Sequence, residues 1–140
     1  MENKIKTIIV DDNFTFLESL SSCIADDDKF EVIGKFVTGV QLLESDELKH
    51  ADLLLMDIEM PKLNGIETAK KVNYSHPNLK MVAITFYQDK IYLKQIIEAG
   101  FKGFVNKVNI PDGLFETIDT VLEGKFCYPE NIKILKNPAI

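Results

Sequence analysis

Short apolar runs alternate along this chain with longer segments in which apolar residues recur at helical spacing. The runs are rich in Ile, Val and Leu, as is typical of strands that are buried on both faces of a parallel sheet. We expect strands at residues 6–10, 30–36, 51–56, 80–85 and 103–106. Helical spacing predicts helices within 14–24, 66–72, 88–99 and 111–122. This alternation limits the chain to a fold built from βαβ units.

Five strand–helix units in 140 residues match a single α/β plan. That plan is the flavodoxin-like (βα)5 fold, a doubly wound parallel sheet with strand order 2-1-3-4-5. Its ligand crevice lies at the carboxyl ends of the first and third strands. We assign residues 1–124 to this domain and expect residues 125–140 to form a C-terminal tail or the start of a linker.

Polar residues stand at the predicted carboxyl ends of four of these strands. In chain order they are Asp11, Asp12, Asp57, Thr85 and Lys107. The carboxyl ends of parallel strands lie along one edge of a sheet, so we expect these side chains to converge. Three carboxylates, a hydroxyl and an ammonium group suit a divalent cation and a phosphoryl group.

Each of these residues also has an ordinary explanation when it is taken alone. Asp12 or Asn13 can cap the helix that follows, and Asp57 can be a solvated loop residue. Thr is common in strands, and Lys is common on surfaces. The order of the residues and their shared position after strands favour the site over these separate explanations.

The acidic balance of the chain disfavours direct binding to nucleic acid or to membranes. The net charge is −6, whereas the phosphates of nucleic acids and anionic lipids attract clustered basic residues. No apolar stretch reaches the length of a membrane span, and the N-terminus shows no secretory signal. Two widely separated cysteines are typical of a reducing compartment. The expected location is the cytoplasm.

Further residues complete a recognisable combination. They are Met60-Pro61 and Gly65 after Asp57, and the run Gly103-Phe104-Val105-Asn106-Lys107. Together with Asp11-Asp12 and Thr85, this combination resembles the receiver domains of bacterial two-component response regulators over about residues 4–124. The stretches 92–107 and 124–129 are most similar to the NarL-type subgroup.

The resemblance implies a role for each residue of the predicted site. Asp57 would accept a phosphoryl group from the phosphohistidine of a sensor histidine kinase. Mg²⁺ would be held by three side chains and by the backbone carbonyl of Glu59; the side chains are those of Asp11, Asp12 and Asp57. Thr85 and Lys107 would respond to the phosphoryl oxygens, and Phe104 matches the aromatic switch residue.

The resemblance also implies how the signal leaves the domain. Such a protein is not an enzyme, apart from catalysing its own phosphoryl transfer and autodephosphorylation. Its output would be transcription regulation through a DNA-binding domain absent from this chain, or through a partner protein, with a phosphorylation-dependent homodimer as a further expectation. An apolar output face is expected at Ile91, Tyr92, Phe101 and Phe104, although these side chains could equally pack on the sheet.

Two other functions remain open from the sequence. Asp57-Ile58-Glu59 resembles the D-x-D motif of haloacid-dehalogenase-type phosphohydrolases, but that family needs Asp where Glu59 stands, and the pair Asp11-Asp12 would be unexplained. A pseudo-receiver that binds a partner without phosphorylation is the second alternative. The intact set of acidic residues argues against it.

Overall fold

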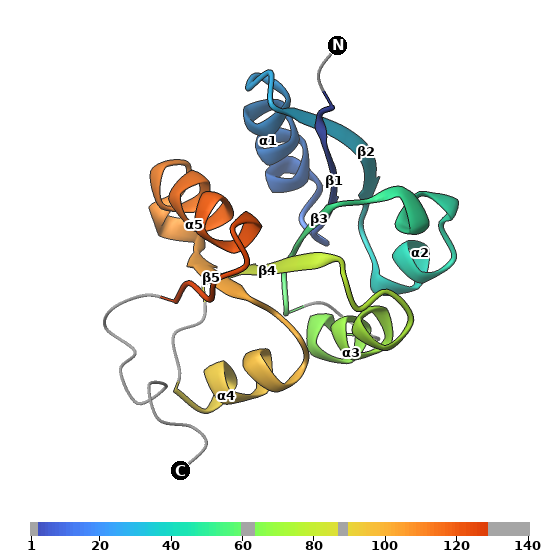
Figure 1. The fold of residues 1–140 in the computed structure, drawn as a ribbon, viewed down its shortest axis with the longest axis vertical. Coiled ribbons are helices and arrows are strands. Elements are labelled where there is room, and N and C mark those ends of the chain that lie inside the picture. Colours follow the sequence, from blue (N-terminus) through green and yellow to red (C-terminus); the bar gives the residue numbers. More distant parts are fainter. Residues whose placement is uncertain (1–2, 60–63, 87–89, 129–140) are drawn as a thin grey trace.

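The computed structural model describes residues 3–59, 64–86 and 90–128, and it contains a five-stranded parallel sheet (Figure 1). The strands are β1 (Ile5–Val10), β2 (Phe30–Phe36), β3 (Leu53–Met56), β4 (Lys80–Thr85) and β5 (Gly103–Asn106). Their order is β2-β1-β3-β4-β5, and every pair of neighbours is parallel. The predicted fold class and strand order are confirmed.

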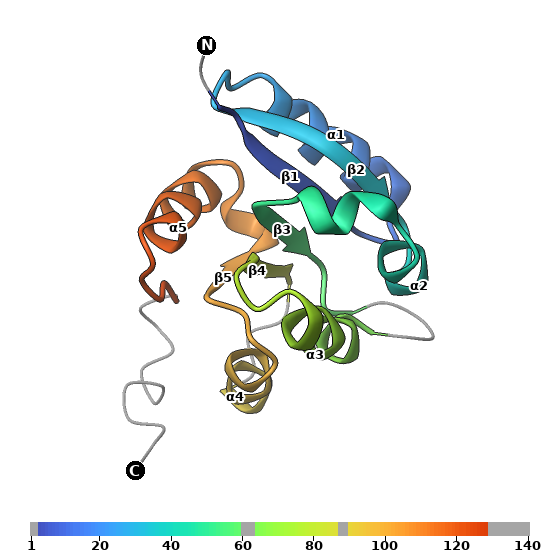
Figure 2. The same cartoon turned by 45° about the vertical axis from the view of Figure 1, so that its right-hand side comes forward.

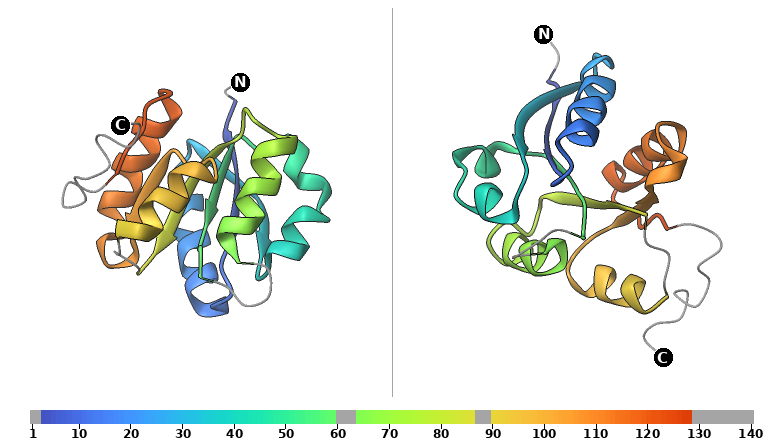
Figure 3. Two further views of the ribbon diagram at one scale, coloured as in Figure 1. Left: turned by 90° about the horizontal axis from the view of Figure 1, so that it is seen from below. Right: turned by 180° about the vertical axis from the view of Figure 1, so that it is seen from behind.

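Five α-helices connect and follow the strands. They are α1 (Phe14–Ala25), α2 (Gly39–Leu43), α3 (Gly65–Ser75), α4 (Lys90–Glu98) and α5 (Asp112–Leu122), with 3-10 turns η1 (Asp46–His50) and η2 (Lys107–Asn109). Helices α1 and α5 cover one face of the sheet, and α2, α3 and α4 cover the other (Figures 2 and 3). None of the helices in the described part of the chain is long and apolar enough to cross a membrane.

Both faces of the sheet are buried, which explains why the strands lack an alternating polar pattern. Ile9, Leu55 and Ile84 pack in the cluster under α1 and α5. Val10 and Met56, which lie next to two of them along the strands, pack in the cluster under α2, α3 and α4. The core strands β1, β3 and β4 therefore place their carboxyl ends at one edge with little freedom to shift in register.

The helices after β1 and β3 begin with asparagine caps. The Asn13 side chain accepts a hydrogen bond from the backbone N–H of Phe16, and the Asn64 side chain accepts one from Glu67. Gly65 starts α3 so close to the preceding loop that a Cβ there would overlap the backbone carbonyl oxygen of Asp57. These starts fix the loops that carry the acidic residues.

Some element boundaries differ from the sequence-based expectation. β3 begins at Leu53, two residues later than expected. The preceding residue, Asp52, donates its backbone N–H to the Lys6 carbonyl, and its side-chain carboxylate accepts the Lys6 N–H. The connection from β2 to β3, for which the sequence predicted no bounded helix, contains α2 and η1. Of the expected helix 88–99, the structure describes Lys90–Glu98 as α4, and residues 87–89 lie outside the described part.

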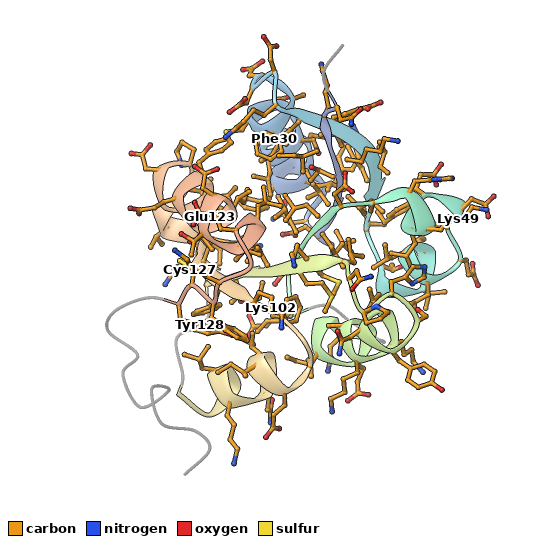
Figure 4. All side chains as sticks on the ribbon, viewed as in Figure 1. Phe30, Lys49, Lys102, Glu123, Cys127 and Tyr128 are labelled. Carbon is orange, nitrogen blue, oxygen red and sulfur yellow. The ribbon has the colours of Figure 1, made fainter. Side chains whose placement is uncertain are left out.

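Residues 125–128 continue along the edge of β5. Cys127 donates its backbone N–H to the Lys102 carbonyl (2.9 Å) and accepts from the Phe104 N–H (3.1 Å). The Tyr128 hydroxyl donates to the Phe101 carbonyl at 3.1 Å. Figure 4 shows Lys102, Cys127 and Tyr128 side by side between α4 and α5. The first four residues of the expected tail thus pack on the domain, and residues 129–140 lie outside the described part.

Candidate functional site

The structure brings the predicted acidic residues together at the carboxyl edge of the sheet. Asp11 and Asp12 follow β1, and Asp57 follows the neighbouring strand β3. One carboxylate oxygen from each of the three lies within 4.8 Å of the others. This spacing is small enough for a single cation to contact all three.

Two of the three carboxylates are buried, and each is oriented by a short turn. Asp11 is 2% exposed and Asp57 is 5% exposed, while Asp12 faces solvent. One Asp11 oxygen accepts the backbone N–H of Asn13 at 2.8 Å, and one Asp57 oxygen accepts that of Glu59 at 3.0 Å. In each carboxylate the other oxygen, Oδ2, points into the site toward Lys107.

Lys107 supplies the positive charge of the site from the end of β5. Its Nζ lies 2.8 Å from Asp11 Oδ2 and 3.2 Å from Asp57 Oδ2, and its side chain is only 7% exposed. The ammonium group therefore bridges the two buried carboxylates. With Asp12 alongside, the cluster still has more negative than positive charges, which favours a divalent cation.

The environment raises the pKa values of both Asp57 and Lys107. Burial is the main cause that raises the pKa of Asp57 from 3.8 to about 6; the negative charge of Asp11 adds to it, against the lowering effects of the Glu59 N–H and of Lys107. Burial alone lowers the pKa of Lys107, but Asp11 and Asp57 outweigh it and raise that pKa above its usual value. At neutral pH the site thus holds an ionised Asp57 and a firmly protonated Lys107.

The other predicted residues lie at the same edge or just behind it. Thr85 ends β4, pairs in register with Asn106, and is 1% exposed. Phe104 is 3% exposed and packs in the cluster under α2, α3 and α4. Glu59 is exposed in the loop after Asp57, and Met60-Pro61 lies outside the described residues.

The expected apolar output face is corrected in part. Phe101 and Phe104 are 0% and 3% exposed, so both pack inside the domain and neither forms a docking surface. Phe104, in β5, and Phe101, two residues before that strand, pack in the same cluster as Leu93 and Ile96 of α4. The side chains of Ile91 and Tyr92 lie outside the described part.

Two aromatic side chains at the site were missed from the sequence. The Phe16 ring centroid lies 4.3 Å from Lys107 Nζ, and the Phe86 ring centroid lies 5.4 Å from it. Phe86 directly follows Thr85, so its position after a strand could have indicated the site. Phe16 carries no such signal, because an aromatic residue in the first turn of a helix is common.

Comparison with known proteins assigns the chain to a family. The model of the response regulator receiver domain matches residues 7–119. The transcriptional regulatory protein DegU of Brevibacillus brevis is 32% identical over 123 residues, which are 88% of this chain and 52% of DegU. DesR of Bacillus subtilis is 31% identical over 96% of this chain and 67% of its own. The chain belongs to the response regulator receiver family.

Solved structures agree with this assignment. A LuxR-family response regulator from Aurantimonas superposes with a TM-score of 0.85 at 21% identity, covering 93% of both chains. The non-phosphorylated receiver domain of Escherichia coli RcsB gives 0.80 at 25% identity, covering 91% of this chain and all of that one. The resemblance to NarL-type receivers is confirmed. The chain spans about half the length of the first curated relatives that it matches.

Proposed function

We propose that the chain is a phosphoacceptor module, in which Asp57 takes a phosphoryl group from the phosphohistidine of a sensor histidine kinase. The observation that supports this most strongly is a buried carboxylate with one oxygen held by a backbone N–H and the other 3.2 Å from a buried ammonium group. A residue needed only for solubility or for a turn would not be buried where it shares one ammonium group with a second buried carboxylate, Asp11.

The proposed transfer follows from the state of the Asp57 carboxylate. A pKa of about 6 leaves it ionised at neutral pH, so one oxygen can attack phosphorus in line with the leaving group. The new P–O bond forms as the P–N bond breaks, and the electron pair of that bond returns to the imidazole nitrogen of the kinase. Lys107 stays within reach of the added phosphoryl oxygens and offsets their charge.

The donor set fits Mg²⁺. Three carboxylate oxygens within 4.8 Å of one another match a hard cation that binds through one or two protein carboxylates, a phosphate and water. When bound, Mg²⁺ would neutralise charge on the carboxylates and on the incoming phosphoryl group. We assign Asp11, Asp12 and Asp57 as side-chain ligands and the Glu59 backbone carbonyl as a further ligand.

We further propose that Thr85 and Lys107 convert phosphorylation into a conformational signal. Both stand at strand ends beside Asp57, and their hydroxyl and ammonium groups can donate to phosphoryl oxygens. Phe104 is buried in this structure. Phosphorylation would therefore make this inward position more favourable than its alternatives, as a shift between existing populations.

The proposed partners extend beyond the kinase. The relatives are transcriptional regulators of which this chain matches about half the length, so an output domain or a partner protein would receive the signal. A solved RcsB structure at 25% identity is described as two RcsB dimers bound to two parallel DNAs. We therefore include a phosphorylation-dependent homodimer in the proposal, whereas direct DNA contact by this acidic chain is not part of it.

Intact mass spectrometry tests the acceptor. The chain is incubated with acetyl phosphate with and without Mg²⁺, beside Asp57→Asn and the matched exposed-site control Asp28→Asn. We expect one added phosphoryl group in the parent and in the control, dependent on Mg²⁺ and absent in Asp57→Asn. Labelling that survives Asp57→Asn would assign the acceptor elsewhere. No labelling of the parent from acetyl phosphate or from a phosphorylated kinase would favour the pseudo-receiver.

Amide chemical shifts test the switch. Beryllofluoride should shift the amide resonances around Asp57 and also those from Thr85 to Lys107. The Thr85 hydroxyl and the Lys107 ammonium group, at the two ends of that stretch, are expected to bind the fluorine atoms that take the place of phosphoryl oxygens. Thr85→Ala should reduce the distant changes while acceptance at Asp57 largely persists. Changes confined to the neighbours of Asp57 in the parent would contradict the proposed switch.

A further inference from the structure

Among the described residues, the Lys107 ammonium group has two aromatic neighbours in addition to its two carboxylates. The Phe16 ring comes from the first turn of α1, and the Phe86 ring comes from the residue after β4. Their centroids lie 4.3 and 5.4 Å from Nζ, inside the range in which a cation is attracted to a ring face. One side chain from α1 and one from the loop after β4 thus lie next to the same ammonium group.

Packing alone does not account for the Phe86 ring. Its side chain is 64% exposed, so most of its apolar surface gains nothing from burial. Lys107, by contrast, is 7% exposed, and part of its shielding comes from rings that lie within contact distance of Nζ. The attraction between the Lys107 ammonium group and the ring face stabilises this exposed position of Phe86.

We propose that Phe16 and Phe86 are positioning residues, whose ring faces hold the Lys107 ammonium group at the phosphoryl site. The inference rests on the proposed function and adds two residues, Phe16 and Phe86, to which the phosphoacceptor chemistry assigns no role. The rings touch neither the acceptor carboxylate nor the transferred group in this proposal; they act only through Lys107.

The rings matter most when Asp11 serves as a metal ligand. In this structure the closest partner of Nζ is Asp11 Oδ2, at 2.8 Å. An Asp11 carboxylate that ligates a cation no longer serves the ammonium group alone, and the positive charge beside it repels Nζ. The ring faces do not bind a metal, so a bound cation does not compete with Lys107 for them. We therefore expect the rings to contribute most when a metal and a phosphoryl group occupy the site.

Positioning of the Lys107 ammonium group matters because a lysine side chain is flexible. A lysine side chain loses much of its rotamer freedom when its ammonium group is fixed, and its charge can otherwise remain in water. Two ring faces close to Nζ restrict the ammonium group before a phosphoryl group arrives. The result is a more ordered donor for the phosphoryl oxygens.

Binding of beryllofluoride in the presence of Mg²⁺, followed by NMR on the full chain, tests the inference. Phe86→Leu and Phe16→Leu each remove one ring while keeping an apolar side chain. We expect each to weaken beryllofluoride binding by about two- to fivefold. Phe86→Trp, which offers a better ring face at an exposed position, should tighten binding relative to the parent.

A matched control and a second readout separate positioning from general damage. Phe14→Leu alters a side chain that is as exposed as Phe86 and lies on the same helix as Phe16, and it should bind as the parent does. The methylene protons beside Lys107 Nζ should show ring-current shifts in the parent that decrease in each leucine variant. A purely structural role for the rings would not produce the order Leu, Phe, Trp at position 86.

The outcomes distinguish this inference from the proposed function. If the parent binds beryllofluoride and both leucine variants bind it equally well, the positioning role is overturned and the acceptor role stands. If the parent itself does not bind, the proposed function fails and the inference fails with it. Should Phe16→Leu prove unfolded by circular dichroism, the exposed Phe86 series decides alone, because its three side chains barely affect the core.

Discussion

Replacement of Asp57 by asparagine should stabilise the folded chain at neutral pH. The Asp57 side chain is 6% exposed, and burial is the largest cause of its raised pKa. An ionised carboxylate in this place is less stable than it is in the unfolded chain, where water surrounds it. Asparagine keeps a carbonyl oxygen that can accept the Glu59 N–H but carries no charge.

The magnitude follows from the shift of the pKa from 3.8 to about 6. A shift of about 2 units corresponds to ~3 kcal/mol at neutral pH. Because the folded state binds more protons than the unfolded chain between these two pKa values, the free energy of unfolding of the parent decreases as pH rises through that window. The attraction of Lys107 for the carboxylate is already contained in this shift, because Lys107 is one of the causes that lower the pKa. We therefore expect a stabilisation of ~3 kcal/mol above pH 7.

Urea unfolding followed by circular dichroism measures this difference between about pH 4 and pH 8. The buffer must contain EDTA, because a cation bound to the native site would stabilise the parent and mask the effect. The gap between Asp57→Asn and the parent should open as pH rises and largely close near pH 4, whereas the exposed-site variant Asp28→Asn should show no such gap. A gap that is absent at neutral pH, or that is equally large at pH 4, would refute burial of the charge as its origin.

Three further changes probe the loops, the metal ligands and the C-terminal edge. Asp12→Ala should abolish binding of Mn²⁺ in a relaxation titration and phosphorylation with it, since it removes one of three clustered carboxylates; unchanged titration would mean that the cation site is elsewhere. Gly65→Ala should lower the free energy of unfolding by more than ~2 kcal/mol, because its Cβ would overlap the Asp57 backbone, and a neutral result would contradict that contact. Tyr128→Phe should cost about 1 kcal/mol through the lost bond to the Phe101 carbonyl, and we would abandon that bond if urea unfolding were unchanged.

The sequence was sufficient for the centre of the sheet because β3 and most of β1 and β4 are buried on both faces. Runs such as Leu53–Met56 have no polar interruption, so strand positions and order followed from composition and alternation. The helix α2 was different: it has five residues, and its start depends on the Thr38 side chain accepting the Gln41 N–H. So short a segment has too little periodicity to be distinguished from a loop.

The site could be predicted as a set of residues but not as a geometry. Parallel strands bring Asp11 and Asp57 to one edge, so their proximity follows from topology alone. The bridging position of Lys107 and the raised pKa of Asp57 depend on depth of burial, which the sequence does not specify. The contacts of Phe16 and of the Cys127 backbone join segments far apart in the chain, and local patterns carry no signal for them.

The position of Lys107 links charge at the site to the edge of the domain. Any event that changes Asp11 or Asp57 must change the partners of Nζ, because the ammonium group bridges both carboxylates. Lys107 directly follows β5, and in that strand the Phe104 N–H is bonded to Cys127. Cys127 also donates its backbone N–H to the Lys102 carbonyl, so two backbone hydrogen bonds join the segment 125–128 to β5 and the residue before it. We therefore expect a displacement of β5 to move this segment. If Asp57 is phosphorylated as proposed, the buried ion pair and the short strand before Lys107 would link that event to the segment 125–128.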